Sequence, residues 1–387
     1  MTAAPLIPPD QLARADKILF IAHLALGDYT YLQNCFMAFA EAYPHVRMHL
    51  WVDEVRRTKD ASKWEQLKKY ALYDWVEACP FFDKVYRRTY SPGLLHESIR
   101  QAQDENYPLV VSLAVIRPHR YASLARAISP HGLVLGMGER RGFFHALFQP
   151  HHRLALNRLD AVIPPYSIDR HKPAHISAIY ADWFRQLCGL DVSVEKRFPF
   201  VNIPVEWLAH AARQLALWGV SKHEGKLVFL NPFAKTKKRC WPLEHIVELV
   251  AAMRRHATWR DAFFIINAAP PELVRVRQLI DAHGLTRSAA FSAEDSFFQL
   301  PAVLSQCDLV ISVETAVMHL ANAVHVPVIA LMRTKNPEWA PIDRDNSMVI
   351  TTTRRSSWVA EIPVEKVLQA VDTFKPGQMH SSAGHRP

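Results

Sequence analysis

Four segments of this sequence place polar or charged residues where apolar runs end. The first, Ala25-Leu-Gly-Asp28, comes directly after the apolar run that begins at Lys17. Asp28 is suited to cap the helix that follows, and a carboxylate there could also act as a general base that removes a proton from a hydroxyl group. Gly27 suits a tight turn beside it. The residues alone leave both roles of Asp28 open.

The second segment is strongly cationic. Four of the five residues in Lys235-Thr-Lys-Lys-Arg239 carry positive charge, and the segment follows an apolar run that ends at Leu230. Cations in a loop between a strand and a helix can hold a polyphosphate, because they neutralise the charge that builds on a leaving group. The alternative is an ordinary basic loop in contact with solvent.

The third segment, Ala268-Ala-Pro-Pro-Glu272, also stands where an apolar run gives way to a helix. A glutamate near a helix N-terminus is favoured by the helix dipole. The carboxylate of Glu272 could instead accept a hydrogen bond from a ribose hydroxyl group, and the residues alone do not decide between these roles.

The fourth segment is Ser312-Val-Glu-Thr-Ala-Val-Met-His319, in which a Glu-Thr pair opens a helix. The backbone N–H groups of Thr315, Ala316 and Val317 would be available to bind an anion such as pyrophosphate. The alternative is a capped helix of the protein core.

These segments depend on elements that recur along the whole chain. Short apolar runs rich in Val, Ile and Phe alternate with helix-length amphipathic segments. Continuous apolar runs predict strands that are covered on both faces and therefore parallel. The expected strands begin at Lys17, Val46, Lys84, Leu109 and Leu133, and again at Lys226, Ala262, Ser288, Asp308 and Val326. Strands that alternate with helices predict α/β domains with doubly wound sheets.

The strand pattern restarts near residues 190–205, which predicts two Rossmann-like domains. The expected divisions are a flexible N-terminal segment (1–16), a first domain (17–200), a second domain (201–375) and a disordered tail (376–387). Ligands of such folds bind at the carboxyl ends of strands, so we expect a cleft between the two domains.

Composition excludes several classes of protein. The 387 residues are 49% hydrophobic and 21% charged, which excludes wholesale disorder. The five cysteines are far apart and form no CxxC pair, which favours reduced thiols in a cytoplasmic protein over a disulfide framework or structural zinc. The N-terminus has no signal-peptide pattern. The long apolar stretch 309–332 contains Glu314 and His319, which argues against a membrane span.

Other functions fit the motifs less well. The nearest match to a dinucleotide fingerprint, Gly136-Met-Gly-Glu-Arg-Arg-Gly142, is one residue too long and does not follow the first strand. His145, His151 and His152 do not form a helical metal-binding pair with a carboxylate. The net charge of +9 would suit nucleic acid, an anionic membrane or a phosphorylated substrate, but no nucleic-acid-binding module is present.

In their order and spacing, the four segments resemble glycosyltransferase family 9, the bacterial lipopolysaccharide heptosyltransferase family. The resemblance spans residues 17–372. It is carried by Leu26-Gly-Asp28, Ala42-Tyr-Pro44, Tyr107-Pro-Leu-Val-Val-Ser-Leu113, Asn231-Pro-Phe-Ala234, Lys238-Arg-Cys-Trp-Pro242 and Asp308-Leu-Val-Ile-Ser-Val-Glu-Thr-Ala-Val-Met-His-Leu-Ala321.

This resemblance implies a GT-B fold, with the acceptor bound by the first domain and a nucleotide-sugar bound by the second. It implies an inverting transfer that needs no cofactor and no metal. Asp28 would be the general base, with Gly27 in the turn next to it. The implied donor-binding residues are Lys235, Lys238, Arg239, Glu272, Glu314, Thr315, Ala316, Val317 and His319.

The sequence departs from the family pattern at several positions, among them Arg239, where family members usually have lysine. Glu314 replaces an aspartate that is implicated in contacting the donor sugar, and Ala316 and Phe233 each replace a glycine. ADP-heptose is the leading donor, and the acceptor is expected to be a glycan or lipid-linked glycan of the lipopolysaccharide core. A UDP- or GDP-sugar donor and a non-catalytic pseudo-enzyme that only binds nucleotide-sugar remain alternatives. The excess of basic over acidic residues also suggests peripheral contact with the anionic cytoplasmic face of the inner membrane.

Overall fold

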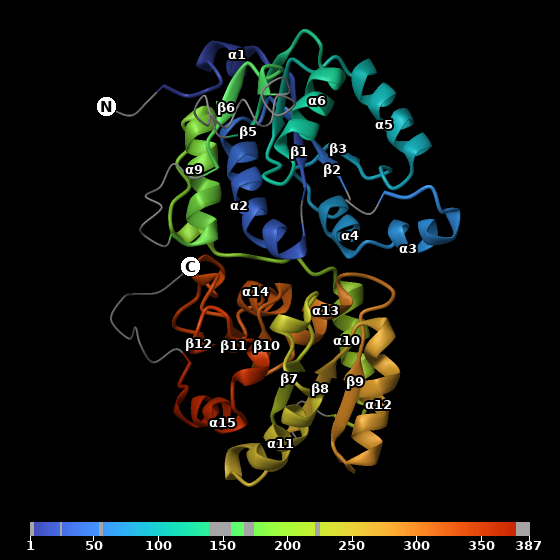
Figure 1. Cartoon of the computed structure of the whole chain (residues 1–387), viewed down its shortest axis with the longest axis vertical. Helices are drawn as coiled ribbons and strands as arrows, with labels where there is room; N and C mark the ends of the chain where they lie inside the picture. The colour runs from blue at the N-terminus through green and yellow to red at the C-terminus, as the bar shows by residue number, and fades with distance from the viewer. Residues whose placement is uncertain are drawn as a thin grey trace. The chain divides into compact units, whose positions relative to one another are not determined.

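The computed structural model describes residues 4–23, 25–53, 57–138, 156–165, 174–220 and 225–376. The chain forms two compact units, Met1–Arg197 and Phe198–Pro387. Each unit contains one six-stranded parallel sheet with helices packed on it (Figure 1). The predicted α/β class is confirmed.

The sheet of the first unit has the strand order β3-β2-β1-β4-β5-β6. This is a doubly wound order that reverses between β1 and β4, so the helix after β1 begins at the switch point where such sheets bind ligands. The strands are β1 (Lys17–Ala22), β2 (Arg47–Val52), β3 (Lys84–Tyr86), β4 (Leu109–Ser112), β5 (Leu133–Met137) and β6 (Ala161–Ile163). The helices are α1 (Pro9–Arg14), α2 (Leu26–Ala42), α3 (Trp64–Lys68), α4 (Ala71–Glu77), α5 (Pro92–Asp104), α6 (Pro118–Ile128) and α9 (Ile176–Cys188), with short 3₁₀ helices η1 (Ala61–Lys63) and η2 (Glu195–Arg197).

The N-terminal segment is folded, so the prediction of a flexible stretch over 1–16 is wrong for the described residues 4–16. Ile7 and Leu12 are buried, with 1% and 2% of their surface exposed. The backbone N–H of Ile7 donates to the carbonyl of Leu187 at the end of α9, over 2.8 Å. Pro8 and Pro9 stand at the start of α1, where proline is well tolerated.

The sheet of the second unit repeats the same topology. Its order, β12-β11-β10-β7-β8-β9, runs from left to right in Figure 1. The strands are β7 (Leu227–Asn231), β8 (Phe263–Asn267), β9 (Ser288–Phe291), β10 (Leu309–Val313), β11 (Val328–Met332) and β12 (Ser347–Thr351). The helices are α10 (Val205–Leu217), α11 (Leu243–Met253), α12 (Leu273–Ala282), α13 (Gln299–Leu304), α14 (Ala316–Ala323) and α15 (Val364–Thr373), with 3₁₀ helices η3 (Lys237–Arg239), η4 (Ala257–Trp259), η5 (Pro270–Glu272), η6 (Pro337–Trp339) and η7 (Val359–Glu361).

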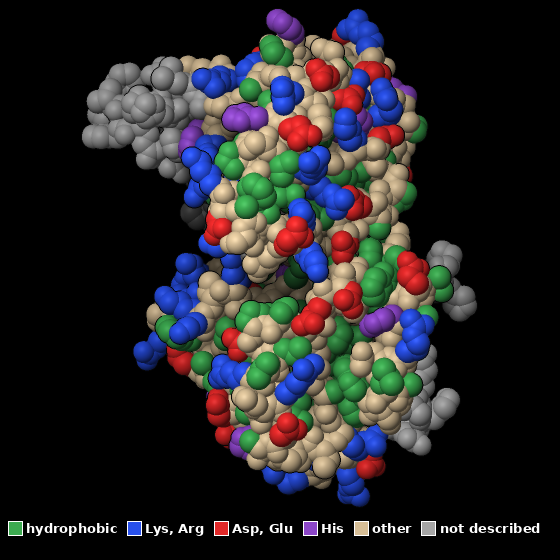
Figure 2. Space-filling model, turned by 90° about the vertical axis from the view of Figure 1, so that its right-hand side faces the viewer, with side chains coloured by type: hydrophobic (Ala, Val, Ile, Leu, Met, Phe, Trp, Pro, Cys, Tyr) green, Lys and Arg blue, Asp and Glu red, His purple; other side chains and the backbone are tan. Residues whose placement is uncertain are grey.

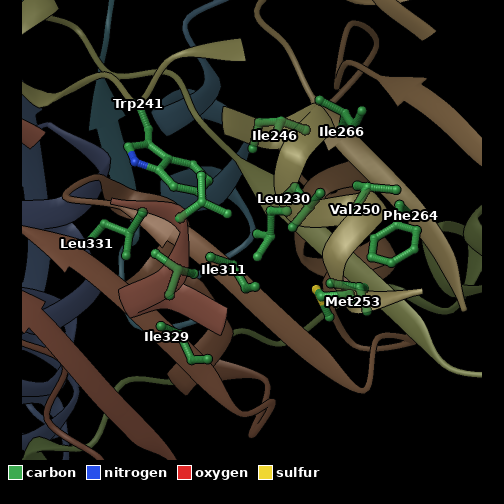
Figure 3. Packing of buried hydrophobic residues seen from close by; sticks show 14 of the residues in the cluster. Leu230, Trp241, Ile246, Val250, Met253, Phe264, Ile266, Ile311, Ile329 and Leu331 are labelled. Atoms are coloured by element: carbon green, nitrogen blue, oxygen red, sulfur yellow. The ribbon is translucent and has the colours of Figure 1, made fainter. Parts of the chain in front are cut away.

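The core of the second unit lies between the sheet and α11 and α15. Figure 3 shows the side chain of Trp241 in the same buried cluster as Leu230, Ile311 and Leu331. The indole Nε1 of Trp241 donates to the carbonyl of Ile362 over 2.9 Å, so its one polar atom is satisfied inside the core. The core therefore fixes the chain two residues beyond the end of the cationic segment.

The surface carries both signs of charge. On the face shown in Figure 2, basic and acidic side chains lie interspersed over both units. All five cysteines are unpaired, and four of them are buried. Among the described residues, no helix has the length and apolar character needed to cross a membrane. The histidines at 145, 151 and 152 and the predicted tail beyond Pro376 lie outside the described residues.

Candidate active site

Asp28 lies in the first turn of α2, at the carboxyl end of β1. It is the third residue of the helix, and its Oδ2 accepts a hydrogen bond from the backbone N–H of Ala25 over 3.0 Å. Its Oδ1 accepts a second hydrogen bond, over 2.9 Å, from the hydroxyl group of Tyr180 in α9. Asp28 thus does satisfy the helix N-terminus. The predicted turn at Gly27 is wrong, because Gly27 is already part of the helix.

The environment of Asp28 makes it a stronger base than an ordinary carboxylate. Burial raises the pKa of Asp28 above 3.8, and the hydrogen bonds from Ala25 and Tyr180 and the charge of His23 offset only part of this effect. A general base gains driving force as its pKa approaches the working pH. The geometry is therefore compatible with proton abstraction by Asp28, with Tyr180 holding the carboxylate in one orientation.

In the second unit, the cationic segment forms a loop that is fixed at both ends. The backbone N–H of Trp241 donates to the carbonyl of Pro232 over 2.9 Å, which closes the loop. Lys235 and Lys238 are exposed, whereas Arg239 is half-buried. The Nη1 atom of Arg239 lies 3.6 Å from Oε1 of Glu314, and Nζ of Lys238 lies 6.0 Å from the ring centroid of Trp358.

Thr315 caps α14 directly after β10. Its Oγ1 accepts a hydrogen bond from the backbone N–H of Val317 over 3.3 Å, so the prediction of a free amide at Val317 is wrong. Within the described residues, no acceptor is present for the backbone N–H groups of Thr315 and Ala316. Two amides and the positive end of the helix dipole thus remain for an anion. Ala316 has helical backbone geometry, so its Cβ introduces no strain there.

Two asparagines, neither of which was predicted to have a role in the site, connect these loops at the carboxyl edge of the sheet. Asn231 and Asn267 are the last residues of β7 and β8. Nδ2 of Asn267 donates to Oδ1 of Asn231 over 2.9 Å. Nδ2 of Asn231 in turn donates to Oγ1 of Thr315 over 2.9 Å and to Oγ of Ser312 over 3.0 Å. This network orients the capping side chain of α14.

The assembly of a cationic loop and a helix N-terminus on one sheet edge agrees with a comparison with protein families. The model described as glycosyltransferase family 9 (heptosyltransferase) matches residues 169–365, just over half of the chain. The chain belongs to glycosyltransferase family 9. It is therefore a glycosyltransferase, and its match to the family spans the whole of the cationic loop and α14.

Solved structures of another family 9 glycosyltransferase and of two heptosyltransferases have the same fold. A family 9 glycosyltransferase from Veillonella parvula is 17% identical, with a TM-score of 0.69 over 94% of this chain and 98% of that chain. Heptosyltransferase II of E. coli is 14% identical, with a TM-score of 0.65 over 92% and 98%. The E. coli heptosyltransferase WaaC with ADP is 16% identical, with a TM-score of 0.63 over 93% and 100%. The fold is thus the GT-B fold. A comparison with curated protein sequences finds no match.

Two predicted donor-binding residues of this family 9 glycosyltransferase are engaged within the protein. His319 is 2% exposed on α14, and its ring centroid lies 6.0 Å from that of Trp339. Glu272 occupies the N-cap position of α12 without a capping hydrogen bond from its side chain, and its Oε2 lies 3.5 Å from Nη1 of Arg275 in the same helix. Their roles toward a donor stay predictions.

Proposed function

We propose that this glycosyltransferase transfers a sugar from a nucleotide-sugar to a hydroxyl group of a glycan or lipid-linked acceptor, with inversion and without a metal ion. The main support for donor binding is that Arg239 lies beside Glu314, which stands directly before the N-cap of α14. Cations and free backbone amides together provide the charge complement that a diphosphate needs.

In this reaction, the acceptor oxygen attacks C1 of the donor sugar while Asp28 takes the hydroxyl proton. The bond between C1 and the diphosphate oxygen breaks, and its electron pair leaves with the nucleoside diphosphate. Lys238, Arg239 and the amides of Thr315 and Ala316 stabilise the charge that develops on this leaving group. Attack from the face opposite the leaving group inverts the anomeric centre.

ADP-heptose is the donor that we propose first. One structure of the E. coli heptosyltransferase WaaC contains ADP-2-deoxy-2-fluoro heptose, and that enzyme shares this fold. Because Glu314 stands where the family pattern has an aspartate, a UDP- or GDP-sugar is the alternative donor. A lipopolysaccharide-core acceptor is supported by the similarity to E. coli heptosyltransferase II, which is described as a lipopolysaccharide heptosyltransferase.

A thermal-shift comparison of ADP, UDP and GDP tests the nucleotide site. At 100 times its dissociation constant, the bound nucleotide should add about 2.7 kcal/mol to the free energy of unfolding. We expect ADP to raise the melting temperature most. A selective rise with UDP or GDP would keep the reaction class but change the donor, and no rise with any of the three would contradict a diphosphate site.

We also propose that the protein works at the cytoplasmic face of a membrane that holds a lipid-linked acceptor. The net charge of +9 favours binding to anionic lipid. Co-sedimentation should increase as the fraction of anionic lipid in the vesicles rises, and should fall as salt is added. Equal sedimentation with neutral and anionic vesicles would count against this location.

A further inference from the structure

The carboxylate of Glu314 is buried and contacts three groups from two other loops. Its side chain is 4% exposed. Nδ2 of Asn336 donates to Oε1 over 2.7 Å, and the backbone N–H of Arg333 donates to Oε2 over 3.4 Å. Nη1 of Arg239 lies 3.6 Å from Oε1. Both carboxylate oxygens therefore have partners within the protein.

These contacts join loops that follow different strands of the second sheet. Arg239 belongs to the loop after β7, Glu314 follows β10, and Arg333 and Asn336 follow β11. A buried carboxylate is costly unless charged or hydrogen-bonded partners compensate for the lost water. The arrangement of these loops is thus coupled to the charge and the length of one side chain.

The link continues to the loop after β12. The guanidinium of Arg333 donates to the carbonyl of Ser357 over 3.0 Å and to that of Arg355 over 2.9 Å. The next residue along the chain, Trp358, lies beside Lys238 of the cationic loop. The contacts thus form a closed series that begins and ends in the cationic loop and includes Glu314.

We propose that Glu314 is a positioning residue that holds Arg239 for the diphosphate, with Asn336 as its main partner, and that it does not bind the donor sugar. This inference rests on the proposed function of the cationic loop. A sugar hydroxyl would have to reach a side chain that is 4% exposed and would compete with Asn336 at 2.7 Å. The longer side chain of glutamate, compared with aspartate, lets the carboxylate reach Asn336 and Arg239 together.

The test is Glu314→Gln, with Glu365→Gln as the matched control. The introduced amide keeps the volume of the side chain, and its carbonyl oxygen can still accept the hydrogen bond from Asn336. Its NH2 group replaces the oxygen that accepts from the N–H of Arg333, and the side chain loses the charge that attracts Arg239. Glu365 is an exposed carboxylate in the first turn of α15. In titrations with ADP and with an ADP-sugar, we expect Glu314→Gln to weaken both by the same factor, about tenfold. The control should bind both as the wild type does.

Two results would overturn the proposal. The first is a Glu314→Gln variant that binds ADP normally but loses affinity for the ADP-sugar. Only a residue that contacts the sugar would affect one of these two ligands and not the other. The second comes from a double-mutant cycle with Arg239→Ala. If Glu314 acts through Arg239, adding Glu314→Gln to Arg239→Ala should change ADP affinity little, whereas full additivity would mean that the two residues act independently.

A further measurement separates this proposal from the proposed function. Amide hydrogen exchange of the full chain without nucleotide should be faster in Glu314→Gln over residues 235–241 and 333–336, and unchanged in β7. If no nucleoside diphosphate binds the wild type while this exchange pattern appears, the proposed function fails but the coupling of the loops stands. Unchanged exchange in both loops would refute the coupling itself.

Discussion

Asp28→Asn should lower kcat by about 100-fold or more while leaving the affinity for the nucleoside diphosphate unchanged. Asparagine keeps the shape of the side chain and can still accept the hydrogen bond from the N–H of Ala25. In the wild type the hydroxyl group of Tyr180 donates to Asp28, and in the variant the new amide can donate to the oxygen of that hydroxyl group instead. The substitution thus removes the basic oxygen with little change in packing. Initial rates at saturating donor measure the effect.

Asp104→Asn provides the matched control, because Asp104 is an exposed carboxylate at the end of α5 in the same unit. We expect that variant to turn over as the wild type does. Normal turnover by Asp28→Asn would remove Asp28 from the mechanism. A wild type that binds nucleotide-sugar and never turns over would instead identify a pseudo-enzyme.

The pH dependence of stability shows whether the Asp28→Asn variant is folded and whether burial acts as described. Burial raises the pKa of Asp28 in the folded state above 3.8. The folded protein therefore binds this proton more tightly than the unfolded chain, and wild-type stability falls as pH rises through the raised pKa. Asp28→Asn should be more stable than the wild type near neutral pH, and the difference should shrink toward about pH 4. Urea unfolding at both pH values measures it.

The central strands were predictable because they are continuous apolar runs. All ten strands expected from the sequence are present, among them Leu309–Val313 and Leu227–Asn231, whose residues are all buried. The two missed strands, β6 and β12, each lie at the edge of a sheet. In β12 only Ile350 is fully buried, so its sequence lacks the run of apolar residues that marks a strand with both faces covered.

The local roles of site residues were harder to predict than their positions along the chain. Gly27 and Asp28 were correctly placed after β1, but glycine favoured a turn where the helix in fact begins. The N-cap of this helix is Ala25, whose methyl group cannot accept a hydrogen bond. The carboxylate of Asp28 instead accepts a hydrogen bond from the backbone N–H of Ala25 from within the first turn.

Contacts between loops that are far apart in the sequence could not be predicted from the pattern of any single segment. The contact between Glu314 and Asn336 depends on the parallel register of β10 and β11, which no local pattern contains. A shared role of Asn231 and Asn267 could have been predicted, because both end an otherwise apolar strand with the same amide. A polar residue at the carboxyl end of a buried parallel strand lies at the edge where ligands bind.

Arg239→Ala should weaken binding of the nucleoside diphosphate by about 10- to 100-fold, since hydrogen bonds to charged groups contribute roughly 1.5–3 kcal/mol each. Arg239 is the half-buried cation of its loop and is oriented by Glu314 at 3.6 Å and by Oγ1 of Thr236 at 3.3 Å. A guanidinium held in one orientation loses less entropy when it binds a phosphate. Titration calorimetry at fixed salt measures the loss.

Lys237→Ala is the control that distinguishes a positioned cation from general attraction. Lys237 lies in the same 3₁₀ helix and is exposed, and its removal changes the net charge of the protein by the same amount. If the diphosphate is held by Arg239 in a fixed geometry, Lys237→Ala should change the affinity less than about twofold, because exposed charges are screened by water and salt. Equal losses in the two variants would mean that the loop attracts anions only through its total charge, and Arg239 would then have no specific role in binding the donor.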